Sequence, residues 1–385
     1  MELNEEELAV AESALQWARR ELGPIADHID QEDAFPPDLF TRLGDQGYLG
    51  AGIPVEYGGA GGDLMTAALV GWALARVSPA VALSYGGNVN LCAHNLLRNG
   101  TPEQKRRYLP GLAAGKLIGA MALTEPNAGS DATSIRTTAI RTAARPAGDG
   151  YILNGTKMFI TNGPIADLIV VYAKTAPELG KKGISAFLVE KGFAGFSVGQ
   201  RLDKMGMRGS PTAELVFTDC EVPATNRLGP ENEGLRVMMS GLDAERAYYS
   251  FTGVGLAEEA FALALRYATQ REQFGAKISE FQLVQSKLAE MYARVEAARL
   301  LAIRAIRRTE AGGRASKEAA AAIFFAAETA RFVTDQAVQI HGGYGYTKDY
   351  AVERFFRDAK LLEIGAGTQE IRRLVIAAEL LGQRH

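Results

Sequence analysis

Three charged side chains, Asp243, Glu245 and Arg246, lie within one helical turn of one another and could carry acid–base chemistry. A carboxylate placed beside a carbon acid can remove its proton as a general base. Opposite charges at this spacing are also typical of a solvated helix surface, where they pair with each other. The local pattern leaves both interpretations open, and taken alone it favours the surface cluster.

Two further segments carry groups that suit a phosphate. Arg271 opens the stretch Arg-Glu-Gln-Phe274, and a guanidinium donates two parallel, charge-assisted hydrogen bonds to a phosphate. Thr368-Gln-Glu370 stands at an expected helix start, where free backbone amides favour anions. Without further context, Arg271 is more simply explained as a solvated charge at a helix end. The glycine-rich stretch 57–63 lacks the spacing of a phosphate-binding loop, so we predict a turn there.

The composition argues against several classes of function. The 385 residues carry a formal net charge of −3 with the two signs interspersed, so neither a nucleic-acid nor a membrane partner is expected. Cys92 and Cys220 lie far apart, and the four histidines show no metal-ligand spacing, so we expect no disulfide framework and no metal site. Apolar runs fall short of the ~20 residues of a membrane span. The acidic N-terminus is unlike a targeting peptide, and we expect a soluble, cytoplasmic protein.

The apolar pattern divides the chain into three parts. Residues 1–120 are predicted to be mainly helical, residues 121–230 to form a small β unit, and residues 231–385 to form a helical bundle. Capping residues at Thr101-Pro-Glu-Gln104 predict a helix start, and Gly312-Gly313 predicts a break between two helices. The helical stripes are Leu8, Ala11, Leu15, Ala18 and Leu22 in the first part, and Val284, Leu288, Met291, Val295 and Ala298 in the last.

The middle part is rich in short β-type runs. Tyr151–Leu153 and Thr156–Ile160 flank Asn154-Gly155, a pair whose left-handed preference predicts a tight hairpin. Further strands are predicted at Ile169–Lys174, Ile184–Glu190 and Glu214–Phe217.

Four segments together resemble the acyl-CoA dehydrogenase family, and the resemblance covers nearly the whole chain. They are Met121–Asp131, Phe159–Gly163, Gly241–Arg246 and Leu362–Arg373. The resemblance implies a mainly α fold with a central β domain, namely a helical domain, a small β-barrel domain and a C-terminal four-helix bundle. It also implies FAD as the cofactor, because the family removes a proton and a hydride from adjacent carbons of a thioester and no side chain accepts hydride.

The position of the base distinguishes branches of this family. Most members carry the carboxylate directly before the Gly-Thr pair that is Gly367-Thr368 here, but this chain has Ala366 at that place. The isovaleryl-CoA dehydrogenase branch carries its glutamate at the position that matches Glu245. The chain is therefore most similar to that branch, and Glu245 is the predicted catalytic base.

The resemblance also assigns binding residues. The family's first and second flavin segments match the loop after residue 121 and the stretch at Phe159, where tryptophan is frequent, and a neighbouring subunit is implied to supply the contacts around Arg271 and Gly343. His341 is expected to be a packed, neutral side chain, since the family uses no histidine acid or base. The predicted flavin contacts are Leu123, Thr124, Ser130, Phe159, Thr161, Arg271, Phe274, Gln282, Gln339, Gly343, Thr368 and Glu370. The predicted substrate contacts are Ser130, Lys182, Asp243, Arg246, Tyr249, Ala366 and Gly367.

The predicted reaction is FAD-dependent α,β-dehydrogenation of a short or branched acyl-CoA, with isovaleryl-CoA first, in fatty-acid or branched-chain amino-acid catabolism. Tyr248, Tyr249, Leu362 and Arg236 depart from the isovaleryl branch, and the two tyrosines are expected to shorten or redirect the acyl pocket. An electron-transferring flavoprotein as acceptor and a homotetramer are implied by the resemblance. Three alternatives stay open: a desaturase of carrier-protein thioesters, an oxidase that reduces oxygen, and a non-catalytic CoA- or flavin-binding protein.

Overall fold

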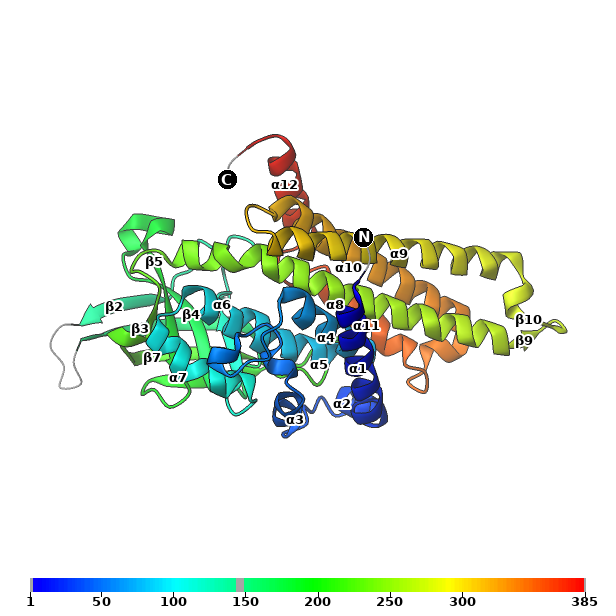
Figure 1. Cartoon of the computed structure of the whole chain (residues 1–385), viewed down its shortest axis with the longest axis horizontal. Coiled ribbons are helices and arrows are strands. Elements are labelled where there is room, and N and C mark those ends of the chain that lie inside the picture. Colours follow the sequence, from blue (N-terminus) through cyan, green and yellow to red (C-terminus); the bar gives the residue numbers. More distant parts are fainter. Residues whose placement is uncertain (1–2, 143–148, 384–385) are drawn as a thin grey trace.

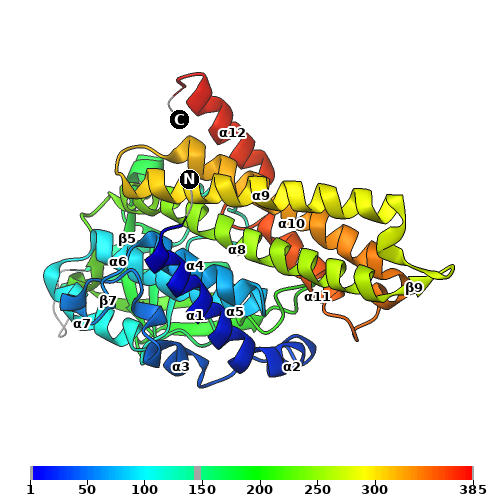
Figure 2. The same cartoon turned by 45° about the vertical axis from the view of Figure 1, so that its right-hand side comes forward.

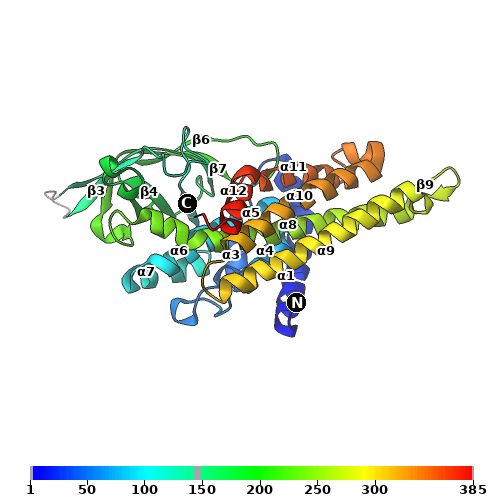
Figure 3. The same cartoon turned by 90° about the horizontal axis from the view of Figure 1, so that it is seen from above.

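The computed structural model describes residues 3–142 and 149–383, and its β-rich part and its long helices lie at opposite ends (Figure 1). Helix α8, Gly234–Gln270, runs from the β unit to the far end of the molecule. The N-terminal helices pack beside it, and the view from above shows the same separation of β unit and bundle (Figure 3). The mainly α fold with a central β unit is confirmed.

The N-terminal part is helical because its elements are capped and bury one face. Asn4 and Glu7 form a capping box at the start of α1, and Thr101 and Gln104 form the predicted one at α7. In the α1 stripe Ala11, Ala18 and Leu22 are buried, but Leu8 is 47% exposed, because the buried face is rotated toward Ala14 and Trp17. The helices are α1 Glu5–Glu21, α2 Ala26–Gln31, α3 Leu39–Asp45, α4 Leu64–Ala75, α5 Pro79–Gly86, a π-helix Gly87–Ala93, α6 His94–Asn99 and α7 Pro102–Ala113.

The middle part forms an eight-stranded sheet with the order β6-β7-β3-β2-β4-β5-β8, in which β1 pairs with β4. Strands β4 and β5 are buried along almost their whole length, which explains their continuous apolar sequences. All three of the further strands predicted for this part form. The strands are β1 Gly119–Ala122, β2 Thr138–Thr142, β3 Gly150–Thr161, β4 Leu168–Lys174, β5 Ile184–Glu190, β6 Phe196–Arg201, β7 Thr212–Pro223 and β8 Arg227–Leu228.

The predicted hairpin at Asn154-Gly155 is wrong, because β3 runs straight through these residues. A register shift against β7 marks a bulge there, and the Asn154 side chain bonds both the backbone and the carboxylate of Asp219 on β7. A Cβ at Gly155 would stand 2.8 Å from Thr137 Cα, so the glycine serves close strand packing rather than a turn.

The C-terminal part is a bundle in which α10 packs against α8, α9, α11 and α12 (Figure 2). Gly312 and Gly313 both have positive φ and separate α9 from α10, as predicted. The small hairpin of β9 Glu272–Gln273 and β10 Ala276–Lys277 closes the far end. The remaining helices are α9 Gln282–Glu310, α10 Ser316–His341, α11 Val352–Leu362 and α12 Gln369–Leu380.

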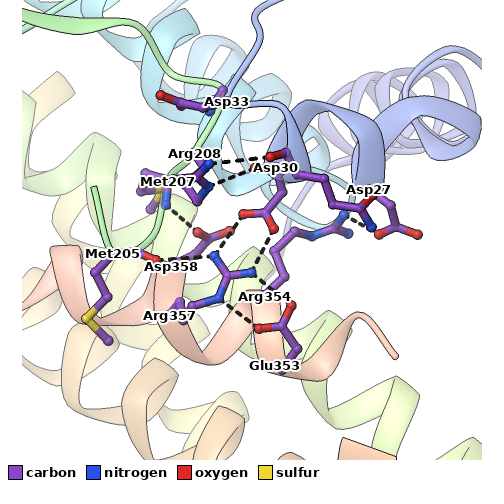
Figure 4. Close-up of polar contacts among 12 residues, drawn as sticks. Asp27, Asp30, Asp33, Met205, Met207, Arg208, Glu353, Arg354, Arg357 and Asp358 are labelled. Carbon is purple, nitrogen blue, oxygen red and sulfur yellow. Dashed lines mark hydrogen bonds and ion pairs between the residues drawn. The ribbon is translucent and has the colours of Figure 1, made fainter. Parts of the chain in front are cut away.

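A buried ionic cluster joins the three parts (Figure 4). Arg357 of α11 donates to both carboxylate oxygens of Asp30 on α2, at 2.9 and 2.7 Å, and also pairs with Glu353. The fully buried Asp358 accepts a hydrogen bond from the backbone amide of Met207, in the loop between β6 and β7. The cluster therefore fixes α11 against both the helical part and the β unit.

Across the described residues, no helix is both long and apolar enough to cross a bilayer.

Candidate active site

The charged cluster on α8 faces the protein interior. Arg246 is only 5% exposed and lies 3.9 Å from Asp243, whose carboxylate accepts a hydrogen bond from Ser316 Oγ of α10 at 2.8 Å. Glu245 between them is half-buried. The cluster is therefore not a solvated helix surface, and the simpler interpretation of this pattern is wrong.

Glu245 lies in an environment that adjusts its basicity. Burial raises the pKa of Glu245 to about 7, while the positive charges of Arg246, Arg98 and Arg372 lower it. A carboxyl with a pKa near neutrality is a stronger base than a solvated glutamate and is still partly ionised at pH 7.

The turn between α11 and α12 packs against this cluster. Ala366 and Gly367 adopt φ values of 56° and 90°, and the buried Arg372 donates to the carbonyl oxygens of Leu362 at 2.8 Å and Gly365 at 2.6 Å. A Cβ at Gly367 would stand 4.0 Å from Arg246 Nη2. The turn offers a methyl group at Ala366 and no carboxylate, so the base cannot come from that residue.

Two glycines connect the cluster to the β unit. The Tyr249 hydroxyl would lie 2.8 Å from a Cβ at Gly86, and Thr161 Cγ2 would lie 3.4 Å from a Cβ at Gly87. Because neither glycine has a side chain, the tyrosine of α8 and the end of β3 approach the same short stretch of backbone. Tyr249 and Thr161, both predicted site residues, are thereby brought together.

The loop that follows β1 is held by a buried ion pair. Lys157 is fully buried and donates to the carbonyl oxygen of Leu123 at 3.0 Å and to Glu125 at 2.8 Å, while the amide of Met158 donates to the Thr124 carbonyl at 2.8 Å. Burial lowers the pKa of Lys157 to about 8, and Glu125 opposes that shift. Leu123 and Thr124 are thus fixed next to Phe159 and Thr161 on β3.

Phe159 presents a large apolar surface to solvent. Its side chain is 64% exposed and its φ is 61°, at a second register shift between β3 and β7. An exposed aromatic ring next to the Thr161 hydroxyl suits a flat, conjugated ligand with polar edges. These residues fit the isoalloxazine ring of the flavin, and Ser130 lies exposed in the same loop as Thr124.

Five of the other predicted flavin contacts lie at the far end of the bundle, namely Arg271, Phe274, Gln282, Gln339 and Gly343. Arg271 and Gly343 line a cavity of about 460 Å³ together with Tyr344, whose ring lies 5.6 Å from the Arg271 guanidinium carbon. Phe274 is 97% exposed. Gln282 and Gln339 are also exposed.

Arg271 lies too far along α8 from Glu245 for both residues to reach one flavin within one chain. Glu245 and Arg271 are 26 residues apart on a continuous helix, which spans about 39 Å. This separation agrees with the prediction that a neighbouring subunit supplies Arg271.

The remaining predicted residues are placed as follows. Thr368 caps α12 through the amide of Ile371 at 3.4 Å, and Glu370 lies exposed in the first turn of that helix. Lys182 is exposed in the turn Pro177–Gly183, which contacts α8. His341 is buried, its Nδ1–H donates to the Ala337 carbonyl oxygen at 2.8 Å, and burial lowers its pKa, as expected of a packed neutral side chain.

Comparisons with known proteins agree with this geometry. Family models described as the N-terminal, middle and C-terminal domains of acyl-CoA dehydrogenase match residues 4–116, 120–220 and 232–381. The chain belongs to the acyl-CoA dehydrogenase family. It is an oxidoreductase that uses FAD, the cofactor of this family.

Individual relatives are similar over nearly their whole length. Mitochondrial isovaleryl-CoA dehydrogenase of Solanum tuberosum is 47% identical over 375 residues, which cover 97% of this chain and 90% of the relative. Butyryl-CoA dehydrogenase of Megasphaera elsdenii superposes with a TM-score of 0.95 at 39% identity, with 99% of each chain covered. A structure described as the electron transferring flavoprotein of Acidaminococcus fermentans has a TM-score of 0.95 at 42% identity, again over 99% of each chain.

Three residues around the site were missed by the sequence analysis. Arg98 and Arg372 act on Glu245 from α6 and α12, and Lys157 anchors the loop of Leu123. Arg372 lies inside a matched segment and could have been noticed there. Arg98 and Lys157 have no signal in the local sequence, because their partners are distant in the chain.

Proposed function

We propose that this acyl-CoA dehydrogenase oxidises a short or branched acyl-CoA, with isovaleryl-CoA first, and that Glu245 is its catalytic base. One observation carries the proposal. Glu245 is a half-buried carboxylate surrounded by positive charge, and the turn at Ala366 provides no alternative acid. The similarity to isovaleryl-CoA dehydrogenase supports the same acyl group.

In the proposed reaction Glu245 removes the α-proton of the thioester. The electron pair left on the α-carbon forms the new double bond as the hydrogen on the β-carbon departs. FAD supplies the acceptor for that hydride. The residues of the chain orient the reactants: Leu123, Thr124, Phe159 and Thr161 for the flavin ring, and Arg246 with the Gly367 turn for the substrate.

The region around Gly86 supports a short acyl group. The Tyr249 hydroxyl lies against the backbone there, 2.8 Å from the position that a Cβ at Gly86 would take. Tyr249 also packs edge-on against Tyr248 with ring centroids 5.0 Å apart, so two aromatic rings form this wall. A branched or short chain is favoured over a long straight one.

Two partners belong to this proposal. The distal position of Arg271 and Phe274 supports a flavin site completed by a second copy of the chain, in a homotetramer. An electron-transferring flavoprotein is the proposed acceptor, in line with the Acidaminococcus neighbour.

The test is an anaerobic titration of the yellow protein with straight, branched and cyclic acyl-CoAs, followed by flavin bleaching. Glu245→Ala should fold, retain FAD and bind thioester, but bleach about 10²–10⁴-fold more slowly. Undiminished bleaching by this variant would refute the base assignment. Bleaching only with a phosphopantetheinyl carrier protein, and not with any acyl-CoA, would refute the substrate class.

A further inference from the structure

Arg98, in the last turn of α6, lies against α8 at Gly241. A Cβ at Gly241 would stand 3.3 Å from Arg98 Cζ and 3.7 Å from Nε, and closer still to Nη2. A real Cβ does not approach a guanidinium nitrogen this closely, so a side chain at position 241 would push the flexible end of Arg98 away from this position. Gly241 therefore creates a notch in α8 that receives the guanidinium.

Glu245 lies one turn further along the same face of α8. Side chains in an α-helix point back toward the N-terminus and cover the turn that precedes them. The carboxylate of Glu245 is thus directed toward the surface above Gly241, where Arg98 lies. Arg98 is one of the positive charges that lower the pKa of Glu245, although part of the Arg98 side chain stays exposed to solvent at the end of α6.

Two asparagine side chains on one face of α6 hold this helix next to the notch. Asn99 Nδ2 donates to Ser240 Oγ at 3.0 Å, directly beside Gly241. One turn earlier on the same face of α6, Asn95 Nδ2 donates to the hydroxyl of the buried Tyr172 at 2.9 Å. Arg98 is therefore presented to α8 by two hydrogen bonds that do not involve its own side chain.

The other arginines near Glu245 form ion pairs or hydrogen bonds with other groups. Arg246 pairs with Asp243, and Arg372 donates to two backbone carbonyls of the α11–α12 turn. In the part of the chain that the structure describes, we find no such partner for Arg98. The charged and titratable groups that face Glu245 are Arg98 of α6, Arg246 and Tyr249 of α8, Arg372 of α12 and Tyr172 of β4, with Asp243 acting through Arg246.

We propose that Arg98 is a positioning residue that holds the carboxylate of Glu245 ionised and directed at the substrate, across the notch left by Gly241. The inference deepens the proposed function, because it concerns the same base. Arg98 does not need to touch the substrate for this role. Its effect depends on its distance from Glu245, and Gly241 sets that distance.

The chain offers a matched pair of variants. Arg98→Met removes the charge, and Gly241→Ala keeps the charge but displaces the guanidinium from the notch. An opposite charge within ~4–6 Å lowers a carboxyl pKa by about 1–3 units, so each variant should raise the midpoint of the pH–kcat/KM profile by about one unit. The ionised fraction of Glu245 at pH 7 then falls from about one half to about one tenth, and kcat/KM falls about fivefold. Activity should recover at pH 9, where the carboxyl is ionised in every variant.

The double variant and the lysine variant complete the test. If Gly241 acts only through Arg98, adding Gly241→Ala to Arg98→Met should change the midpoint no further. Arg98→Lys should restore most of the lower midpoint, because it keeps a positive charge on a long side chain. An unchanged midpoint in both Arg98→Met and Gly241→Ala, with FAD content intact, would overturn the proposal.

A second readout does not depend on turnover. Infrared difference spectra against Glu245→Gln report the ionisation of the Glu245 carboxyl directly in the holoenzyme. Arg98→Met should raise that pKa even if Glu245 is not the base, and no change would overturn the positioning role. If instead Glu245→Gln leaves bleaching intact while Arg98→Met still moves the infrared titration, the proposed base is refuted and the Arg98 contact is kept.

Discussion

Glu245→Gln should make the protein more stable at alkaline pH while it abolishes most of the activity. Burial raises the pKa of this carboxyl from 4.5 to about 7, so the folded state resists its ionisation. The difference of about 2.5 units corresponds to about 3.4 kcal/mol at 1.36 kcal/mol per unit. Because the side chain is only half-buried, solvent screening reduces the expected gain to about 1–2 kcal/mol.

The size of the stabilisation changes with pH, while its sign stays the same. Above pH 7 the carboxyl is ionised in both states and the folded state carries the full penalty, which glutamine removes. Between pH 7 and pH 4.5 the folded state takes up the proton first and the penalty shrinks. Below pH 4.5 the carboxyl is protonated in both states, and the variant and the parent should be equally stable.

The assay is denaturant unfolding of the FAD-loaded protein at pH 8.5 and at pH 4.5, at one protein concentration. Glu12→Gln on the exposed face of α1 is the matched control and should show no gain at either pH. A Glu245→Gln variant that is no more stable than the parent at pH 8.5 would show that the carboxyl is solvated, and the argument for a strengthened base would fail.

Three further substitutions test other parts of the structure. Arg357→Met removes the bidentate partner of Asp30 and should lower the free energy of unfolding by about 3–5 kcal/mol. If the denaturant concentration at half-unfolding does not change, the buried ion pair does not stabilise the fold. Tyr249→Leu should deepen the pocket at Gly86. The ratio of kcat/KM for six- to eight-carbon acyl-CoAs to kcat/KM for isovaleryl-CoA should then rise by about tenfold or more. If this ratio does not change, Tyr249 does not limit the length of the acyl chain. Arg271→Ala should weaken FAD binding about tenfold, measured as flavin lost on gel filtration, and full retention would remove Arg271 from the site.

Much of the fold was accessible from the sequence, since it depends on local patterns. The helices were predicted from apolar spacing, from the capping box at Thr101 and from the glycines at 312–313. Strands β4 and β5 were predicted from runs of apolar residues. The hairpin prediction failed at Asn154-Gly155 because the same dipeptide also serves a bulge. Turn preference is a local property, whereas strand packing against Thr137 is not.

The sequence by itself determined the family, the flavin and the absence of a carboxylate at Ala366, because these follow from residue types in short segments. Only the tertiary structure decided that the cluster around Glu245 is buried, and that Arg98 and Arg372 converge on it from α6 and α12. The pKa of a carboxyl depends on desolvation and on charges within a few ångströms. Those neighbours come from positions 98 to 372, and no sequence spacing encodes their distances.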